Sequence, residues 1–155
     1  MLRMVDIIHH RESIFEQLRK LDADKKPEFG VMTPQHMVEH LAYVVRFSNG
    51  KLPQKLHYRD EKAEKFKQYT IYTDRELMPG FKAPMLGDEP ARLVHTDINA
   101  ALANLHQELE DFDAFFANMP DAKPVSPTLG ELDYKEWVIF HNKHFKHHLK
   151  QFGLA

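Results

Sequence analysis

Four of the eleven histidines of this chain lie within eight residues near its C-terminal end. They are His141, His144, His147 and His148, in a segment from residue 137 to residue 152 that neither proline nor glycine interrupts. Apolar residues recur in this segment at three- and four-residue steps, which predicts a single helix. At about 100° per residue, His141, His144 and His148 fall on one side of that helix. Imidazoles gathered on one side can bind a metal ion together.

The opposite side of the predicted helix carries Lys143, Lys146 and Lys150. Because lysine ammonium groups must reach water, the histidine side is expected to face the core. His147 projects away from that side, and we expect it to have a structural role. Burying several imidazoles costs free energy unless their nitrogens find partners, and a metal ion is the simplest partner.

A second helix supplies the next candidate ligand. Thr33 suits the N-cap position and Pro34 suits the first helical position, so a helix is predicted from there to about Phe47. His40 lies in the middle of the apolar face of this helix, and His36 lies one turn earlier on the same face.

Two histidines four residues apart on a helix can bind one metal ion, and His144 and His148 have this spacing. His40 is the best-placed third ligand. Three neutral imidazoles with an open fourth position form a catalytic type of site that suits zinc, nickel or iron(II). A metal held in this way can acidify a bound water or hold a substrate thiolate.

Other polar residues are expected next to this site. His36, His141 and Gln151 are candidates for contacts with the ligands or with the substrate, and Glu39 or Tyr43 could fix the orientation of an imidazole. In a closed, non-catalytic site, His141 or His36 would be the fourth ligand. The remaining alternative is a hydrogen-bonded cluster of histidines that binds no metal.

The pattern of the whole chain favours an all-α fold. Two more amphipathic helices are predicted at about residues 9–22 and 97–118, and Asp133 is the expected cap of the last helix. Four such helices without a convincing sheet favour a four-helix bundle, as one domain over residues 1–155.

A long irregular connection is expected between the second and third long helices, over residues 51–95. Within it, residues 59–68 are charged and predict a short surface helix. Residues 69–73 have a β-like composition without a partner strand, and residues 78–87 are rich in loop-forming residues. A connection of this length either forms a lid or pocket wall or simply covers the core.

Composition narrows the expected partners and location. With 21 basic and 23 acidic residues, the net charge of −2 gives no reason to expect a nucleic acid or an anionic membrane as partner. No apolar run approaches the roughly 20 residues that span a bilayer. The first residues contain no apolar region of signal-peptide length, so a cytoplasmic location is expected. The chain has no cysteine, so any thiol in its chemistry must come with a substrate.

Two segments carry a resemblance to a known family, namely MTPQHMVEHL (residues 32–41) and HFKHHLKQFG (residues 144–153). On these motifs the chain resembles the DinB/YfiT-like superfamily of four-helix-bundle metalloenzymes, and within it a bacterial subgroup. That superfamily carries one histidine on its second helix and a His-x-x-x-His pair on its last helix, often followed by Arg-Gly-Gln. Carried over, the three ligands are His40, His144 and His148. Gln151 matches the glutamine of the motif, whereas the two residues before it depart from Arg and Gly.

The resemblance also implies a chemistry. Members of the superfamily include thiol-dependent enzymes, namely transferases that add bacillithiol and isomerases that use mycothiol. This implies a metal-dependent enzyme, a thiol transferase or a hydrolase, that uses zinc or nickel to activate a low-molecular-weight thiol or water against a small electrophilic substrate. The alternative is a non-catalytic metal-binding or stress-related bundle protein. Bundles of this kind often pair, so a homodimer is one possible assembly, although no exposed apolar stripe in the sequence requires it.

Overall fold

The computed structural model describes residues 2–77 and 90–155, and this part of the chain is mainly helical. Its helices are α1 (Glu12–Lys20), α2 (Pro34–Val45), α3 (Asp60–Ile71), α4 (Ile98–Asn118) and α5 (Tyr134–Gln151). A short antiparallel hairpin, β1 (Val125–Ser126) and β2 (Gly130–Glu131), lies between α4 and α5. The predicted all-α fold is confirmed, and the expected loop of residues 78–87 lies outside the described residues. None of the described helices is both long and apolar enough to span a membrane.

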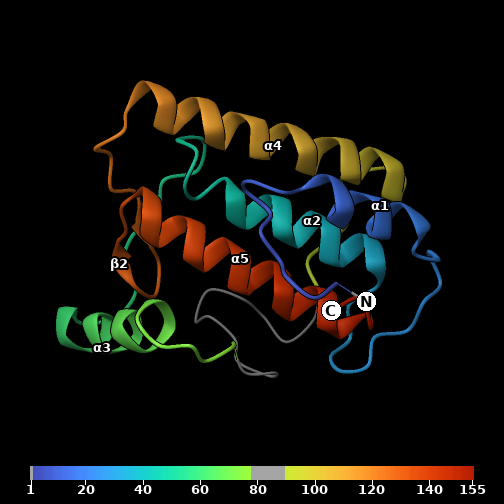
Figure 1. Ribbon diagram of the computed structural model, residues 1–155, viewed down its shortest axis with the longest axis horizontal. Helices are drawn as coiled ribbons and strands as arrows, with labels where there is room; N and C mark the ends of the chain where they lie inside the picture. The colour runs from blue at the N-terminus through green and yellow to red at the C-terminus, as the bar shows by residue number, and fades with distance from the viewer. Residues whose placement is uncertain (1, 78–89) are drawn as a thin grey trace.

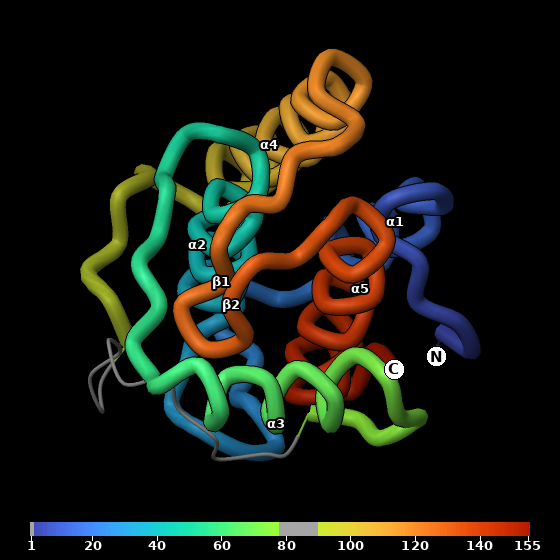
Figure 2. Tube along the Cα trace, turned by 90° about the vertical axis from the view of Figure 1, so that its left-hand side faces the viewer, coloured from blue at the N-terminus to red at the C-terminus, as the bar shows by residue number. Residues whose placement is uncertain are grey.

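Four of the helices surround a shared core. Figure 2 shows α1, α2, α4 and α5 around it, with α3 outside them at the end where the hairpin lies. α2 and α4 run in the same direction, and α5 runs the opposite way (Figure 1). Because the chain must return to the starting end of the bundle between two parallel helices, the connection over residues 51–95 has to be long.

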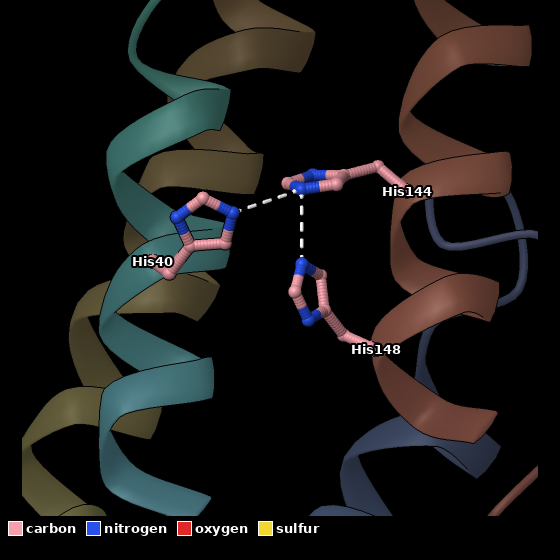
Figure 3. Close-up of side chains that lie close together, drawn as sticks. All are labelled: His40, His144 and His148. Atoms are coloured by element: carbon pink, nitrogen blue, oxygen red, sulfur yellow. Dashed lines mark hydrogen bonds between the residues drawn. The ribbon is translucent and has the colours of Figure 1, made fainter. Parts of the chain in front are cut away.

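Helix α2 lies between α4 and α5 and contacts both. Its buried residues therefore cover a wide arc, since Val38 and Val45 are as fully buried as Met37 and Leu41. A helix that packs on two neighbours needs apolar residues on more than one narrow stripe. This central position directs the face that carries His40 toward α5 (Figure 3).

Polar caps determine where the long helices begin. The Asp97 carboxylate accepts a hydrogen bond from the Ala100 N–H at 2.8 Å at the start of α4. At the start of α5 the Glu136 N–H donates to the Asp133 carboxylate at 2.9 Å, and the Asp133 N–H donates to the Glu136 carboxylate at 3.0 Å. Such a reciprocal capping box satisfies two backbone donors that the helix leaves free. The predicted cap at Asp133 is confirmed.

The segment of β-like composition lies at the end of a helix. Residues 69–73, which have a β-like composition, complete the last turn of α3 and the bend that follows it. Ile71 is buried and belongs to the core cluster. Packing of this helix turn outweighs the weak intrinsic preference of Tyr, Thr and Ile for strands. The two short strands of the described part lie in the linker before α5.

Candidate metal centre

Three histidines from two helices meet inside the bundle. His40 lies in the middle of α2, and His144 and His148 lie one turn apart on α5 (Figure 3). The Nε2 atom of His144 is 3.0 Å from that of His40 and 3.2 Å from that of His148. One nitrogen from each ring lies within 4.8 Å of the other two, so the cluster could hold a metal ion. The structure thus brings together the three ligands expected from sequence.

The packing of α5 explains why two of these histidines point inward. Phe145 and Leu149, the residues that directly follow them, are both 0% exposed and so fix the rotation of the helix. His144 and His148 are then 7% and 6% exposed. Phe140, one turn earlier, stacks on the His144 ring with centroids 5.6 Å apart. These contacts leave the His144 ring little freedom to turn away from His40.

Gln151 determines which nitrogen of His148 faces the cluster. Its side-chain oxygen lies 2.9 Å from His148 Nδ1, and its Nε2 donates to the Phe29 carbonyl at 3.0 Å. An amide oxygen can only accept, so His148 carries its hydrogen on Nδ1. A neutral His148 therefore presents a bare Nε2 lone pair to the other two histidines, which is the state that a metal ligand needs.

His144 has polar partners on one side of its ring only. Its Nδ1 is buried and has no hydrogen-bond partner among the described residues, whereas its Nε2 lies between those of His40 and His148. When the His148 Nε2 is bare, the His144 Nε2 can either donate a hydrogen to it or accept one from His40, but it cannot do both. Hydrogen bonds between neutral rings thus leave this cluster incompletely satisfied, whereas one cation would engage all three lone pairs.

Burial keeps the cluster uncharged at neutral pH. Removal from water lowers the pKa of His40 to about 4 and that of His148 to about 3, and the neighbouring imidazoles add to the effect. The pKa of His144 is also well below its usual value, first because of burial and then because of the nearby histidines. Neutral imidazoles are the form that binds metals, so no proton has to be displaced at pH 7.

The donor set and its spacing fit a divalent transition metal. Two imidazole nitrogens at the usual zinc distance and at a tetrahedral angle are about 3.3 Å apart. The observed separations of 3.0 Å and 3.2 Å between Nε2 atoms are close to this value. Three neutral nitrogen ligands suit zinc, nickel and iron(II) better than calcium or magnesium, which prefer oxygen.

A family model for the DinB superfamily matches residues 9–152. The chain belongs to the DinB superfamily. The match spans the helices that carry the three histidines, and the resemblance noted in the sequence is confirmed. Neither the curated proteins nor the solved structures gave a match.

His36 is placed away from the three-histidine cluster of this DinB superfamily member. Its Nδ1 accepts from the Thr33 hydroxyl at 2.7 Å, and the Thr33 backbone N–H also points to it at 3.3 Å. The His36 N–H in turn donates to the Thr33 hydroxyl oxygen. His36 thus completes a capping box at the start of α2. The free N–H groups of the helix end thus engage its ring, and its expected place beside the metal stays a prediction.

His141 lies close to the cluster in sequence but has a different partner. It is 0% exposed, and its Nε2 lies 2.7 Å from the Ser48 hydroxyl. The hydroxyl donates to the Val45 carbonyl at 2.9 Å, so the His141 Nε2–H is the donor to Ser48. Its ring stacks on Trp137, with centroids 5.2 Å apart. The Nε2 that a fourth ligand would offer is therefore already engaged.

The partner that orients a ligand differs from the two proposed on α2. The Glu39 carboxylate accepts from the backbone N–H groups of Val94 and His95, at 2.7 Å and 3.2 Å, and so ties α2 to the segment before α4. Tyr43 is 40% exposed and packs edge-on against Phe47. Neither side chain has a hydrogen bond to a candidate ligand among the described residues, so their expected roles gain no support from these contacts. Gln151, the third residue expected near the site, contacts His148 as described.

Two contacts near the cluster had no clear signal in the sequence. The Phe29 carbonyl that holds Gln151 is a backbone atom, which any residue would supply. The serine that holds His141 follows α2 and indicated only the end of a helix. His147, expected to be structural, lies with Nδ1 3.3 Å from the Leu77 carbonyl and its ring 5.3 Å from that of Phe29.

Proposed function

We propose that the protein is a metal-dependent enzyme in which His40, His144 and His148 hold one divalent ion. Zinc or nickel is the expected metal, with iron as the alternative. The observation that carries the proposal is the convergence of three uncharged imidazoles from two helices, with Nε2 separations of 3.0 Å and 3.2 Å. Three protein ligands leave one position of a tetrahedral ion for a substrate or water.

Different residues of the site would have different roles. His40, His144 and His148 would hold the ion, Gln151 orients His148, and Phe140 restrains the His144 ring. The bound ion would supply a Lewis acid that favours the deprotonated form of a thiol or water. Because the chain has no cysteine, a thiol would have to be a low-molecular-weight cosubstrate, which would attack a small electrophile.

A second candidate function is a metal-stabilised bundle without catalysis. The low exposure of His144 and His148, 7% and 6%, is the observation that favours it. Structural sites are closed, whereas catalytic sites keep a position for an exchangeable ligand. The two candidates differ in whether an added thiol can reach the ion.

The first experiment measures metal binding by the purified chain. Mass spectrometry should find about one transition-metal ion per chain. After the metal has been removed with a chelator, calorimetric titration should show that Zn²⁺ or Ni²⁺ binds again with the same stoichiometry. His40→Ala should lose this binding, whereas His10→Ala, which changes an exposed histidine, should retain it. Failure of the wild-type chain to bind either metal would remove the proposal.

The second experiment separates the enzyme from the scaffold. Cobalt(II) substituted into the site would report added thiols by a change in its visible absorption spectrum. Metal-loaded protein would then be incubated with bacterial low-molecular-weight thiols and small electrophiles, with His40→Ala as the control. Thiol-dependent turnover that disappears in the variant supports the enzyme. One bound ion per chain, with no spectral response to thiols and no turnover, supports the non-catalytic, metal-stabilised bundle.

A further inference from the structure

The turn before α2 is fastened to the end of α5 by two hydrogen bonds. The Glu28 N–H donates to the Gln151 carbonyl at 2.7 Å, and the Gln151 side-chain Nε2 donates to the Phe29 carbonyl at 3.0 Å. Gln151 is 4% exposed. Both its backbone and its side chain are thus attached to a segment more than a hundred residues earlier in the chain.

These contacts allow only one orientation of the Gln151 amide. The NH₂ group faces the Phe29 carbonyl, because two carbonyl oxygens would repel each other there. The side-chain oxygen must then face His148 Nδ1, which lies 2.9 Å away. Reversal of the amide would place an NH₂ group against the Nδ1–H of His148. The backbone of the turn therefore selects the nitrogen of His148 that carries the hydrogen.

Gly30 permits this arrangement for two separate reasons. Its φ angle is +79°, in the left-handed region that glycine adopts without strain. A Cβ atom on Gly30 would also lie 2.7 Å from Nε2 of Gln151, too close for an unstrained contact. Any side chain at this position would displace the amide that holds His148.

We propose that the Phe29–Gly30 turn is a positioning element of the metal site, which acts through Gln151 to hold the Nε2 lone pair of His148 toward His40 and His144. The turn supplies no ligand. Its importance for metal binding rests on the proposed function, but the orientation and tautomer of His148 can be measured without any metal.

The chain offers matched variants to test this relay. Gln151→Ala removes the amide, and Gly30→Ala displaces it without altering any residue of α5. Gly130→Ala is the control, because Gly130 has a similar φ of +82° but no atom within 4 Å of an added Cβ. The control thus carries the backbone strain without a collision. Circular dichroism and thermal melts would confirm that each variant folds.

The first measurement is nitrogen-15 NMR of the histidine rings in the metal-free protein. The signals of His148 would be assigned by their absence from the spectrum of His148→Ala. We expect the hydrogen of His148 on Nδ1 in the wild type and in Gly130→Ala. In Gln151→Ala and Gly30→Ala, the Nε2–H form should become detectable. An unchanged tautomer in both variants would overturn the relay, whether or not the chain binds metal.

The second measurement is the zinc dissociation constant by competition with a chromogenic chelator. Loss of a group that orients a metal-bound histidine typically weakens metal binding by about 10–100-fold. We expect this weakening in Gln151→Ala and Gly30→Ala, and a change of less than about twofold in Gly130→Ala. Unchanged zinc affinity in both relay variants would show that the turn does not position a ligand. A wild-type chain without zinc affinity would instead contradict the proposed function, while a tautomer change would still support the relay.

Discussion

The two halves of α5 bury the same kind of residue for different purposes. In the C-terminal half, His144 and His148 meet His40, and their Nε2 atoms point at one another. In the N-terminal half, His141 is equally buried, but its Nε2 meets the hydroxyl of Ser48. His141 is thus hydrogen-bonded to one neutral hydroxyl, whereas His144 and His148 face a third imidazole.

The facing helix accounts for this difference. α2 runs opposite to α5 (Figure 1). His40 of α2 meets the C-terminal half of α5, and Ser48, which follows α2, meets the N-terminal half. Ser48 and His40 are eight residues apart, and His141 and His148 are seven residues apart, about two helical turns in each case. Whether a buried histidine is a candidate ligand or a packing residue therefore depends on what lies opposite to it.

The largest contrast is expected from removing one histidine in each half. His144→Ala should abolish one-to-one zinc binding, because only two imidazoles remain and no other described residue joins the ligand group. His141→Ala should retain the stoichiometric ion, because its Nε2 is engaged with Ser48 rather than with the cluster. Calorimetric titration of both variants with Zn²⁺ would measure this. Loss of zinc in both variants would mean that the two halves act as one site.

The same substitution at His141 should have a large effect on stability. Truncation of this fully buried ring removes its stacking on Trp137 and its hydrogen bond to Ser48. We expect the free energy of unfolding to fall by roughly 2–4 kcal/mol, as for other large buried side chains that leave a cavity. Urea denaturation of the metal-free proteins would test this. A cost below about 1 kcal/mol would argue against a packing role.

His141 should also make the free energy of unfolding depend on pH. Burial lowers the pKa of His141 from 6.5 to about 3, so the unfolded chain binds a proton between these values and the folded chain does not. Stability is therefore complete above about pH 6.5 and falls as pH decreases toward 3, by about 1.4 kcal/mol per unit for this group.

A variant isolates the contribution of His141 to this acid sensitivity. His141→Phe keeps an aromatic ring in the stack but cannot be protonated. Metal-free wild type and variant would be unfolded in urea at several values from pH 7 to pH 5. We expect the variant to lose less stability over this interval. Equal slopes would indicate that His141 is protonated in the folded chain as readily as in the unfolded one.

The smallest effect is expected from the serine. Ser48→Ala leaves the Nε2–H of His141 without its acceptor in a buried place, which typically costs about 1–3 kcal/mol. Zinc affinity should remain within about twofold, because the Ser48 hydroxyl is hydrogen-bonded to Val45 and His141 and to none of the three candidate ligands in the described structure. Ser13→Ala, at an exposed position of α1, is the control for urea denaturation. A marked change in zinc affinity would show that Ser48 contributes to the metal site.

The sequence by itself determined the elements and the direction of the main histidine face. Asp133 marks the start of α5, lysines exclude one side of it, and the spacing of His144 and His148 follows from the helical period. The inward position of His40 was equally clear, because its neighbours on α2 are apolar. All of these depend on contacts within a few residues, which a periodic pattern records.

Only the tertiary structure decided which histidines share a site. Helical period gives the side of a residue but not the level at which two antiparallel helices face each other. That level places His40 opposite His144 and His148, leaves His141 to Ser48, and brings the Phe29 carbonyl to Gln151. The local capping of α2 similarly takes His36 away from the cluster. Such long-range alignment results from packing of the whole core, which is why no short segment of the chain reveals it.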